Sequence, residues 1–398
     1  MIRHLLKLVW HRKRANALVA VEIFFSFLVI FAVVTGGIAL FSGWRQPLGY
    51  EWKNVWMISI GGGPDDVMAT GDDPMRETIA RVLQEAKTFP QVAGAGLSSM
   101  PPLSGMISEG VWSVGGRRFN LTRDEVTDGF AGALQLKVLR GRWFNANDDA
   151  LDYRPVVVDS DLAEAMFGSA DPIGQKFDET EGLVYRVVGI VPPYRKSGEF
   201  SAPHVNMVFF RKSLTKVNGH IPNHLLVRVR PGTPAEFEAQ LMDHLHRVMP
   251  DVSMDMRRLD QMRDSANRVR TTPIAVGGII ALFLISMVAL GLTGVLWQNV
   301  TRRTRELGLR RAVGASATGV RRQVLAEVAL LATLAVIVGL VVVLQLPLLG
   351  VFAVFTPPVF TTGIIVALVV IYGITLASGL YPSWLASRLT PAEALRYE

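Results

Sequence analysis

The sequence predicts an α-helical membrane protein with four transmembrane helices and an α+β extracytoplasmic domain inserted between the first two. Three observations carry this prediction: apolar segments long enough to cross a bilayer, positive charge concentrated beside them, and two distant β-α-β patterns. The chain has 398 residues, of which 50% are hydrophobic and 19% are charged. This mixture is too apolar for an ordinary soluble protein and too charged for a membrane bundle alone, so a mixed architecture is expected.

Two apolar segments define the first and second predicted transmembrane helices. A hydrocarbon core of about 30 Å requires roughly 20 residues of helix. Residues 17–41 meet this length with Glu22 as their only charge, and residues 273–300 meet it with no ionisable side chain. The first helix is expected to be an uncleaved anchor, because it is longer than the apolar part of a signal peptide and shows no small-residue cleavage motif.

A third apolar region, residues 328–387, contains no Lys, Arg, Asp or Glu. It is too long for one helix, and it contains Pro347 and the pair 357–358, which end helices. We therefore predict a third helix at about 323–346, a short apolar outer loop, and a fourth helix at about 359–385.

The distribution of positive charge predicts the orientation of these helices. Fourteen of the 41 Lys and Arg residues lie in residues 1–14, in residues 301–323 and in the C-terminal tail. Short cytoplasmic loops of membrane proteins are enriched in Lys and Arg. Both termini are therefore predicted inside, and residues 43–270 outside. The net charge of +7 is then a signal of topology, and no nucleic-acid partner is expected.

The region predicted outside contains two β-α-β patterns that lie far apart in the sequence. Such units can pair into one ferredoxin-like α+β part. The first unit spans residues 55–60, 75–89 and 93–98, and the second spans 225–230, 234–248 and 252–256.

Between these units, residues 105–220 favour a β-rich insertion, because short alternating segments are separated by many glycines and prolines. Its predicted strands are residues 110–114, 156–159, 185–191 and 205–210. After residue 259, a polar, helix-permissive segment runs into the second transmembrane helix. A helix that continues across this boundary is expected to act as a stiff stalk.

The loop between the second and third transmembrane helices is short and cationic. Residues 302–313 are predicted to form a helix, supported by the Glu306–Arg310 pair at i, i+4. Gly314 can end that helix in the left-handed conformation, and Ser316 suits the N-cap of the next one. From the residues alone, anchoring on the inner membrane surface and docking of a cytosolic partner are both open interpretations.

Four stretches of the sequence resemble one protein family. RTRELGLRRAVGAS (303–316) and GLYPSWLASRLTPAEALRYE (379–398) are similar to the cytoplasmic-loop signature and the last helix and tail of the MacB/FtsX-like ABC transporter permeases, the type VII transporters. VLRGRWFNANDD (138–149), and AEAMFGSADPIGQKF (163–177) followed by YRVVGIV, are similar to the periplasmic core of that family. The order of one helix, a large outer domain and three helices matches as well.

The resemblance implies a bacterial inner-membrane dimer, either homodimeric or heterodimeric, in which each copy docks a cytosolic ATPase through its loop. It divides the chain into a first helix (1–42), a periplasmic core-like domain (43–270) and an FtsX-like permease domain (271–398). The implied ATPase-coupling residues are Arg302, Arg303, Arg305, Glu306, Leu307, Gly308, Arg310, Arg311, Gly314 and Ala315. The implied C-terminal cytoplasmic motif is Pro391, Glu393, Ala394, Leu395 and Arg396.

The function implied by the resemblance is a permease subunit that couples ATP hydrolysis to conformational work on a substrate outside the inner membrane. Such work includes export, efflux and lipoprotein release by mechanotransmission. The sequence contains no G-x-x-x-x-G-K-[ST] motif. ATP and magnesium are therefore expected on a separate ATPase subunit. This chain itself is expected to bind no cofactor and to have no enzymatic activity.

Further partners implied by the resemblance are membrane lipids and a periplasmic adaptor or outer-membrane protein. The alternative function is a non-transporting transmembrane regulator that activates an extracytoplasmic enzyme such as a wall hydrolase. An ATPase-free sensor is disfavoured by the loop signature.

Acidic residues and histidines offer few other candidate sites. For Glu22 and Glu327, near the inner ends of membrane helices, snorkelling or pairing with arginines is favoured over proton coupling. His220 and His224 are spaced i, i+4, but Pro222 between them argues against a shared helix, so no metal site is expected.

Small residues in the membrane helices allow close helix approach, either within the chain or across a dimer. They are Gly291, Gly294 and residues 377–379.

Overall fold

The structure is a computed structural model. It describes residues 13–61, 73–114, 117–180, 183–200, 206–215, 221–250, 252–302, 313, 316–349 and 356–388. The chain forms two compact units. The helix unit comprises Met1–Ser42 and Thr271–Glu398, and the sheet unit comprises Gly43–Arg270. Each unit is described by itself.

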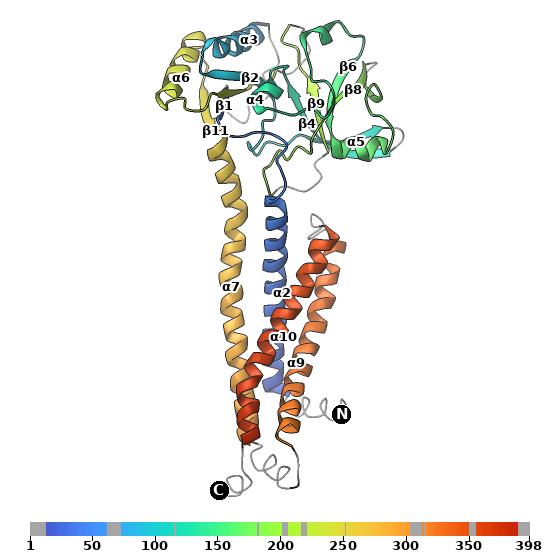
Figure 1. Cartoon of the computed structure of the whole chain (residues 1–398), viewed down its shortest axis with the longest axis vertical. Helices are drawn as coiled ribbons and strands as arrows, with labels where there is room; N and C mark the ends of the chain where they lie inside the picture. The colour runs from blue at the N-terminus through green and yellow to red at the C-terminus, as the bar shows by residue number, and fades with distance from the viewer. Residues whose placement is uncertain are drawn as a thin grey trace. The chain divides into compact units, whose positions relative to one another are not determined.

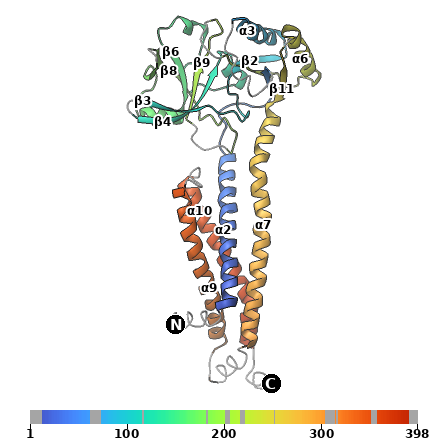
Figure 2. The same cartoon turned by 180° about the vertical axis from the view of Figure 1, so that it is seen from behind.

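Within the described residues, four apolar helices are each long enough to cross a membrane, which confirms the four predicted membrane helices. They are α2 (Lys13–Trp44), α7 (Leu259–Arg302), α9 (Ala317–Gln345) and α10 (Pro357–Arg388), and a short 3-10 turn, η3 (Pro347–Leu349), follows α9. Figures 1 and 2 both show α9 and α10 running side by side.

The helix unit has a packed apolar core. Phe27 and Phe31 of α2 are almost fully buried, and they pack with residues of the other three helices. Close approach is possible because α9 and α10 carry glycines where they meet α2. A Cβ at Gly339 would lie 2.6 Å from the Phe27 ring, and one at Gly363 would lie 2.0 Å from the Thr35 hydroxyl.

The small residues singled out above are used within the chain at two positions. A Cβ on Gly291 would lie 2.8 Å from a Glu22 carboxylate oxygen, and one on Gly379 would lie 2.8 Å from Leu325. At Gly294 a Cβ would meet nothing within 4 Å. Gly291 and Gly379 therefore serve intrachain packing.

One part of the sheet unit is the predicted ferredoxin-like fold. Its strands run in the order β11-β1-β10-β2 and all pair antiparallel. Its elements are β1 (Val55–Ile60), α3 (Asp73–Thr88), β2 (Val92–Ser98), β10 (His224–Val229), α6 (Glu236–Val248) and β11 (Met254–Arg258). Ile79 of α3 and Phe237 of α6 are buried in one apolar cluster with Ile58 of β1.

The other part of the sheet unit is β-rich and continues the same sheet through the order β4-β9-β6-β8-β5. Its elements are β3 (Glu109–Val114), β4 (Arg117–Val126), α4 (Phe130–Leu134), β5 (Arg140–Gly141), η2 (Ala146–Ala150), β6 (Arg154–Asp159), α5 (Ser160–Phe167), β7 (Lys176–Thr180), β8 (Leu183–Val191) and β9 (Met207–Arg211). In Figure 1, α3 and α6 lie at one end of the unit and α5 lies at the other.

The β-rich part contains elements that the strand pattern did not predict. The helix α5 follows β6 without a loop, because the Asp159 carboxylate accepts the N–H of Leu162 at 2.9 Å and caps it. The strand β4 was also not predicted, and its pairing with β2 joins the two parts into one 11-stranded sheet. The expected separate insertion is therefore an extension of the ferredoxin-like sheet.

The helix α7 is continuous from the sheet unit into the apolar region, as the stalk prediction required. It runs for 44 residues with Pro273 in its interior. The predicted N-cap at Ser316 is confirmed, since its hydroxyl accepts the Gly319 N–H at 3.1 Å and α9 begins at the next residue.

Candidate functional site

The segment after β8, residues 192–199, binds the last turn of α2 within the sheet unit. The buried Arg195 guanidinium donates from Nη1 to the carbonyl oxygen of Gly43 at 2.6 Å. The last turn of α2 has no basic residue of its own. Arg195 therefore supplies the positive charge that favours a helix C-terminus.

The same segment binds the start of α7. Glu199 accepts hydrogen bonds and forms an ion pair with Arg263, with an Nε–Oε1 distance of 2.5 Å. The Arg263 guanidinium also lies over the Trp52 ring, 4.4 Å from its centroid. The side chains of Glu199 and Arg263 are 5% and 19% exposed. We call Gly43, Arg195, Glu199 and Arg263 the joint.

Glycine at two positions permits the tight packing at the joint. A Cβ at Gly43 would lie 2.5 Å from the carbonyl oxygen of Glu199. Gly49 has a φ of +85°, and a Cβ there would lie 2.4 Å from the carbonyl oxygen of Pro193. The two ends of the 192–199 segment thus pack against the backbone of Gly49, which follows α2, and of Gly43, in the last turn of α2.

Buried polar groups flank the joint in the sheet unit. Asp124 accepts the Ser98 hydroxyl at 2.7 Å and the Met100 N–H at 2.8 Å. Burial raises the pKa of Asp124 to about 6, even though these bonds and the charge of Lys196 act against the rise. Burial likewise lowers the pKa of Lys196 to about 8, and the charge of Asp124 opposes that change.

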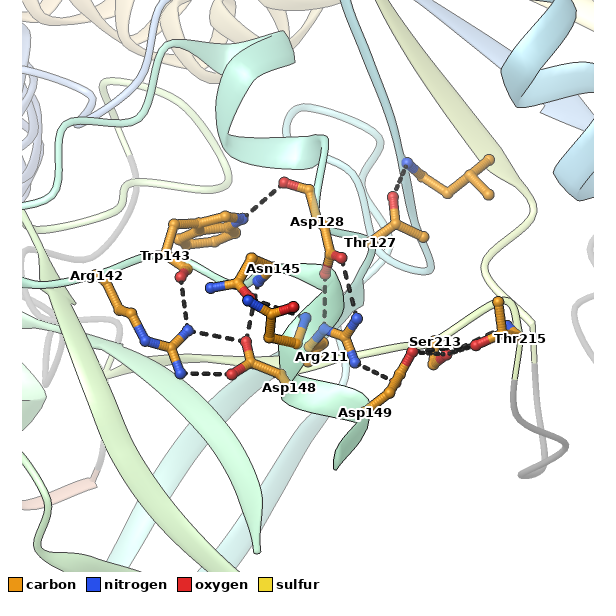
Figure 3. A network of polar contacts seen from close by, with 12 residues as sticks. Thr127, Asp128, Arg142, Trp143, Asn145, Asp148, Asp149, Arg211, Ser213 and Thr215 are labelled. Atoms are coloured by element: carbon orange, nitrogen blue, oxygen red, sulfur yellow. Dashed lines mark hydrogen bonds and ion pairs between the residues drawn. The ribbon is translucent and has the colours of Figure 1, made fainter. Parts of the chain in front are cut away.

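A second polar network fixes the 140–149 segment against the end of β9 (Figure 3). Arg211 donates to both carboxylate oxygens of Asp128, at 2.7 and 3.0 Å, and to Asp149 at 2.6 Å. Arg142 forms a bidentate pair with Asp148, at 2.9 and 2.5 Å. We call these five residues the clamp.

Each carboxylate of the clamp has several donors. Asp148 also accepts the Asn145 N–H at 2.9 Å and takes part in a capping box that starts η2. Asp149 also accepts the hydroxyls of Ser213 and Thr215. Burial alone would raise the pKa values of Asp148 and Asp149, but these hydrogen bonds and the nearby arginines hold both below the ordinary value.

The clamp connects segments that are distant in the sequence. Trp143 donates from Nε1 to the carbonyl oxygen of Asp128 at 3.1 Å, and its ring stacks on Phe130. Thr127 accepts the Leu97 N–H at 2.8 Å, which ties the clamp to β2 of the ferredoxin-like part. The clamp therefore joins the 140–149 segment, Asp128 and the end of β9 within the β-rich part, and the neighbouring Thr127 contacts the ferredoxin-like part.

The predicted ATPase-coupling residues fall almost entirely outside the described part of the chain. Arg302 is the last residue of α7. The residues outside the description are Arg303, Arg305, Glu306, Leu307, Gly308, Arg310, Arg311, Gly314, Ala315, Pro391, Glu393, Ala394, Leu395 and Arg396. Their role stays a prediction.

The other candidates have local partners. Glu327 accepts a hydrogen bond from Gln323 at 3.4 Å. The Nε2 atom of His244 lies within hydrogen-bond distance, 2.9 Å, of a Glu85 carboxylate oxygen. His224 is buried in β10. Among the described residues, no three His, Asp or Glu side chains are grouped so as to hold a metal ion. His220 lies outside the description.

Sequence reasoning missed the joint. Its only local signal is the run PPYRKSGEF, residues 192–200, where three charged residues follow a pair of prolines directly after a buried strand. The clamp lies partly in a stretch quoted above for its resemblance, VLRGRWFNANDD, but the partner Arg211 is 62 residues away from Asp149.

Comparison with known families decides the assignment. The model of the MacB-like periplasmic core domain matches residues 23–243, more than half of the chain, and the model of the FtsX-like permease C-terminal region matches residues 278–391. The chain belongs to the MacB/FtsX-like ABC transporter permeases. The permease is an inner membrane protein, and its sheet unit is a MacB-like periplasmic domain.

Individual relatives agree with this assignment. The permease is 27% identical over 384 residues to the macrolide export ATP-binding/permease protein MacB of Chlorobium luteolum, covering 93% of this chain and 56% of the relative. It is 24% identical to the uncharacterized ABC transporter permease YvrN of Bacillus subtilis, covering 89% and 85%. The chain thus spans about half the length of the curated MacB proteins that it matches most fully.

Solved structures of outer domains are also similar to the permease. The periplasmic region of MacB from Actinobacillus actinomycetemcomitans matches with a TM-score of 0.40 and 15% identity, covering 55% of this chain and 94% of that one. The extracellular domain of the noncanonic ABC-type transporter YknZ from Gram-positive bacteria matches with a TM-score of 0.34 and 14% identity, covering 50% and 94%.

Proposed function

We propose that this permease couples ATP hydrolysis by a separate cytosolic ATPase to conformational work on a substrate outside the inner membrane. Membership of the ABC transporter permeases supports the requirement for an ATPase. The match to 85% of the length of YvrN, which is named as a permease, supports placing the ATPase on another polypeptide.

The observation that carries the proposal is the continuity of α7. At 1.5 Å per residue, its 44 residues span about 66 Å. Arg302, the first of the coupling residues, ends this helix, and Arg263 of the joint lies in its second turn. The helix continues through Pro273, which removes one of its backbone hydrogen bonds, and a continuous helix transmits axial or tilting movement, so ATPase movement at the loop would reach the joint.

The joint is suited to receive that movement. The segment 192–199 contacts the last turn of α2 through Arg195 and the first turns of α7 through Glu199. A change in the spacing of the two helix ends must therefore move this segment, which follows β8 of the periplasmic sheet. The packed core of the helix unit supports a transmitting role for its helices. We further propose that two permease copies act together as a dimer.

Co-purification of the ATPase tests the proposed coupling loop. Replacing Glu306 and Arg310 by Ala should weaken capture of the ATPase by the full-length permease, because the substitutions remove both charges of the loop's i, i+4 pair. The matched control is the double variant E236A/R247A, which removes one acid and one base from exposed positions on α6. Equal ATPase capture by the two double variants would refute the assignment of the loop.

A further inference from the structure

The β-rich part of the sheet unit curls so that two of its strands meet across an interior. Six strands pair in the order β3-β4-β9-β6-β8-β7. β3 and β7 stand at opposite ends of this order, yet they approach each other. The ring of Trp112 on β3 contacts that of Phe177 on β7, with centroids 5.7 Å apart. These strands therefore enclose an interior, as in a partly closed barrel.

One end of that interior is filled by α5. Leu162 and Met166 of α5 are buried in one apolar cluster with Val156 of β6 and Val208 of β9. The start of β4 lies at the same end, since the Arg117 guanidinium donates to the Met166 carbonyl oxygen. Because β6 leads into α5 and β9 runs parallel to β4, the start of β6 and the ends of β4 and β9 lie at the opposite end.

That opposite end holds a pocket of about 300 Å³. We call it the mouth pocket. The lining residues that matter below are Trp112, Arg123, Glu125, Tyr185, Phe210 and Lys212. Its volume is at the lower limit for ligand sites, so it suits a small group and not a whole polypeptide.

The inner face of the sheet changes from apolar to charged where it reaches the mouth pocket. Along β4, Arg123 and Glu125 follow Leu121 at alternate positions, and they pair in register with Val208 and Phe210 of β9. Alternate positions of a strand, and residues paired in register, lie on one face of a sheet. Arg123 and Glu125 are therefore on the face where Leu121 and Val208 are buried, at its open end.

Positive charge predominates in the mouth pocket. Its lining contains four basic side chains and one acidic side chain, Glu125. Arg211 belongs to the clamp, and Lys212 lies 3.6 Å from Oε2 of Glu125. Within the described ranges, no carboxylate pairs with Arg123, whose Nε donates to the Ser108 hydroxyl at 2.8 Å. Its two terminal nitrogens are thus left for an anion, and their planar fork matches a carboxylate.

The mouth pocket also offers an acceptor beside that donor. Glu125 stands two residues after Arg123 on the same face of β4, about 7 Å along the strand. Lys212 lies nearest to Oε2 of Glu125, and the Glu125 side chain is 34% exposed, so Oε1 can accept an N–H group. With a hydrogen bond of about 3 Å at each end, this spacing fits a carboxylate and an N–H group on the same carbon atom.

Aromatic rings form the floor of the mouth pocket. The ring centroid of Phe210 lies 5.4 Å from that of Trp112 and 5.5 Å from that of Tyr185. All three rings pack against the buried cluster and remain partly exposed. Leu183, which is 42% exposed, lines the pocket as well. This floor suits a large apolar side chain, above all an aromatic one.

We propose that the mouth pocket binds the C-terminal residue of an extracytoplasmic polypeptide that ends in an aromatic or large apolar side chain. The terminal carboxylate accepts hydrogen bonds from Arg123, the amide N–H of the same residue donates to Glu125, and the side chain lies against Trp112 and Phe210. An inorganic anion would use only the arginine, and a neutral apolar group would use only the rings. Capture of a terminal carboxylate is an established way to recognise a peptide.

Titration of the full-length permease in detergent tests this proposal. The probe is N-acetyl-para-fluoro-L-phenylalanine, whose acetyl group stands for the preceding peptide, and binding is followed by fluorine NMR. R123Q should weaken binding by about tenfold (about 1.4 kcal/mol), the contribution of a hydrogen bond to a charged group. The matched control R118Q removes an exposed arginine of the same strand that does not line the pocket. It should bind the probe as the wild type does.

Two changes of the probe test the other contacts. The primary amide of the probe lacks the carboxylate, so it should bind the wild type about tenfold more weakly and should lose little more in R123Q. N-acetylglycine lacks the ring, so an equal concentration should not displace the probe. Equal affinity of the acid and the amide for the wild type, or of R123Q and R118Q for the probe, would overturn the proposal.

Free para-fluoro-L-phenylalanine distinguishes a polypeptide end from a free amino acid. Its ammonium group would pair with Glu125, so tighter binding of the free amino acid than of the N-acetyl probe would overturn the assignment to a polypeptide. If R123Q does not fold, the comparison of the acid with the amide on the wild type still gives the answer. The measurement contains no ATPase, so its failure would leave the proposed coupling function standing, and the reverse also holds.

Discussion

The joint and the clamp both pair arginines with carboxylates in the periplasmic sheet unit, and they differ in charge balance. The clamp sets two arginines against three carboxylates, and hydroxyl and backbone donors complete their hydrogen bonds. At the joint, the single buried carboxylate of Glu199 faces Arg195 and Arg263, with Arg270 nearby. One Glu199 oxygen has no hydrogen-bond partner among the described residues.

This difference shows how two similar sets of residues serve different purposes. A network with every donor and acceptor satisfied has one preferred arrangement and makes a rigid connection. The joint is less completely bonded, because one carboxylate oxygen of Glu199 is buried without a partner among the described residues, so fewer hydrogen bonds oppose a shift of its parts. The clamp is therefore suited to hold the sheet together, and the joint is suited to respond to α7. The predictions below test this contrast by the free energy of unfolding of the full-length permease in detergent.

The largest effect is expected at Glu199. E199A leaves the guanidinium groups of Arg263 and Arg195 buried without their carboxylate, which should cost about 3–5 kcal/mol. Denaturant unfolding, monitored by tryptophan fluorescence, measures this loss of stability. The signal reports on the sheet unit, since five of the eight tryptophans lie there.

The control D264A removes a carboxylate that is 71% exposed and lies 3.8 Å from Arg263, so it should change stability by less than about 1 kcal/mol. An equal loss in E199A and D264A would mean that the joint does not depend on a buried ion pair.

The second effect is expected at Arg211, the centre of the clamp. R211A leaves Asp128 and Asp149 without their shared cation, and because their carboxylates are only partly buried the loss should be about 3 kcal/mol. R140A is the matched control, because the Arg140–Asp171 pair is exposed on both sides and should contribute at most about 1 kcal/mol. Similar losses in the two variants would contradict a structural role for the clamp.

The sequence predicted those parts of the fold that local pattern determines. The run VWMISI located β1 at its observed bounds, and the near-absence of charge from residues 17–41, 273–300 and 328–387 located the four membrane helices. The order of two β-α-β units was enough to predict the ferredoxin-like sheet. Helix α5 was missed because a strand pattern and a helix pattern meet at Asp159 without a loop, and only the capping hydrogen bond marks the change.

The joint could not be predicted from the sequence, because its contacts join residues far apart. Arg195 and Gly43 are separated by 152 residues, and Glu199 and Arg263 by 64. Nothing in either segment alone indicates its partner. The coupling loop, by contrast, is predicted from its resemblance to the family signature, and the co-purification experiment tests that prediction.

The third effect concerns pH and the buried carboxyl of Asp124. The folded-state pKa of Asp124 is raised to about 6, above its ordinary value near 4. The protonated form is therefore favoured by folding, and this contribution is fully present below about pH 4 and is lost as the pH rises through 6. The loss should be up to about 3 kcal/mol. Asp159, whose pKa burial also raises to about 6, acts in the same direction.

The variant D124N separates the two carboxyls. It should reduce the fall in stability between pH 4 and pH 7 and leave the part due to Asp159. Lys196 has a pKa of about 8, so it stays charged below pH 7 and does not contribute to this window. Asp148 and Asp149 of the clamp have lowered pKa values, so their contribution is lost only below about pH 4. An unchanged pH slope in D124N would show that Asp124 titrates normally.

The smallest effect is expected at Gly43, and it tests how closely the 192–199 segment packs against the end of α2. A Cβ in G43A would lie 2.5 Å from the Glu199 carbonyl oxygen, so the segment must shift. Overpacking of this kind costs about 1–3 kcal/mol, but Ala gains up to about 1 kcal/mol over Gly in a helix, which leaves a net loss of up to about 2 kcal/mol. The control G132A, on α4, places its Cβ where nothing lies within 4 Å. G132A should be neutral or slightly stabilising. If G43A behaves in the same way, the 192–199 segment is not packed against α2, and a change in the spacing of α2 and α7 would not move the joint.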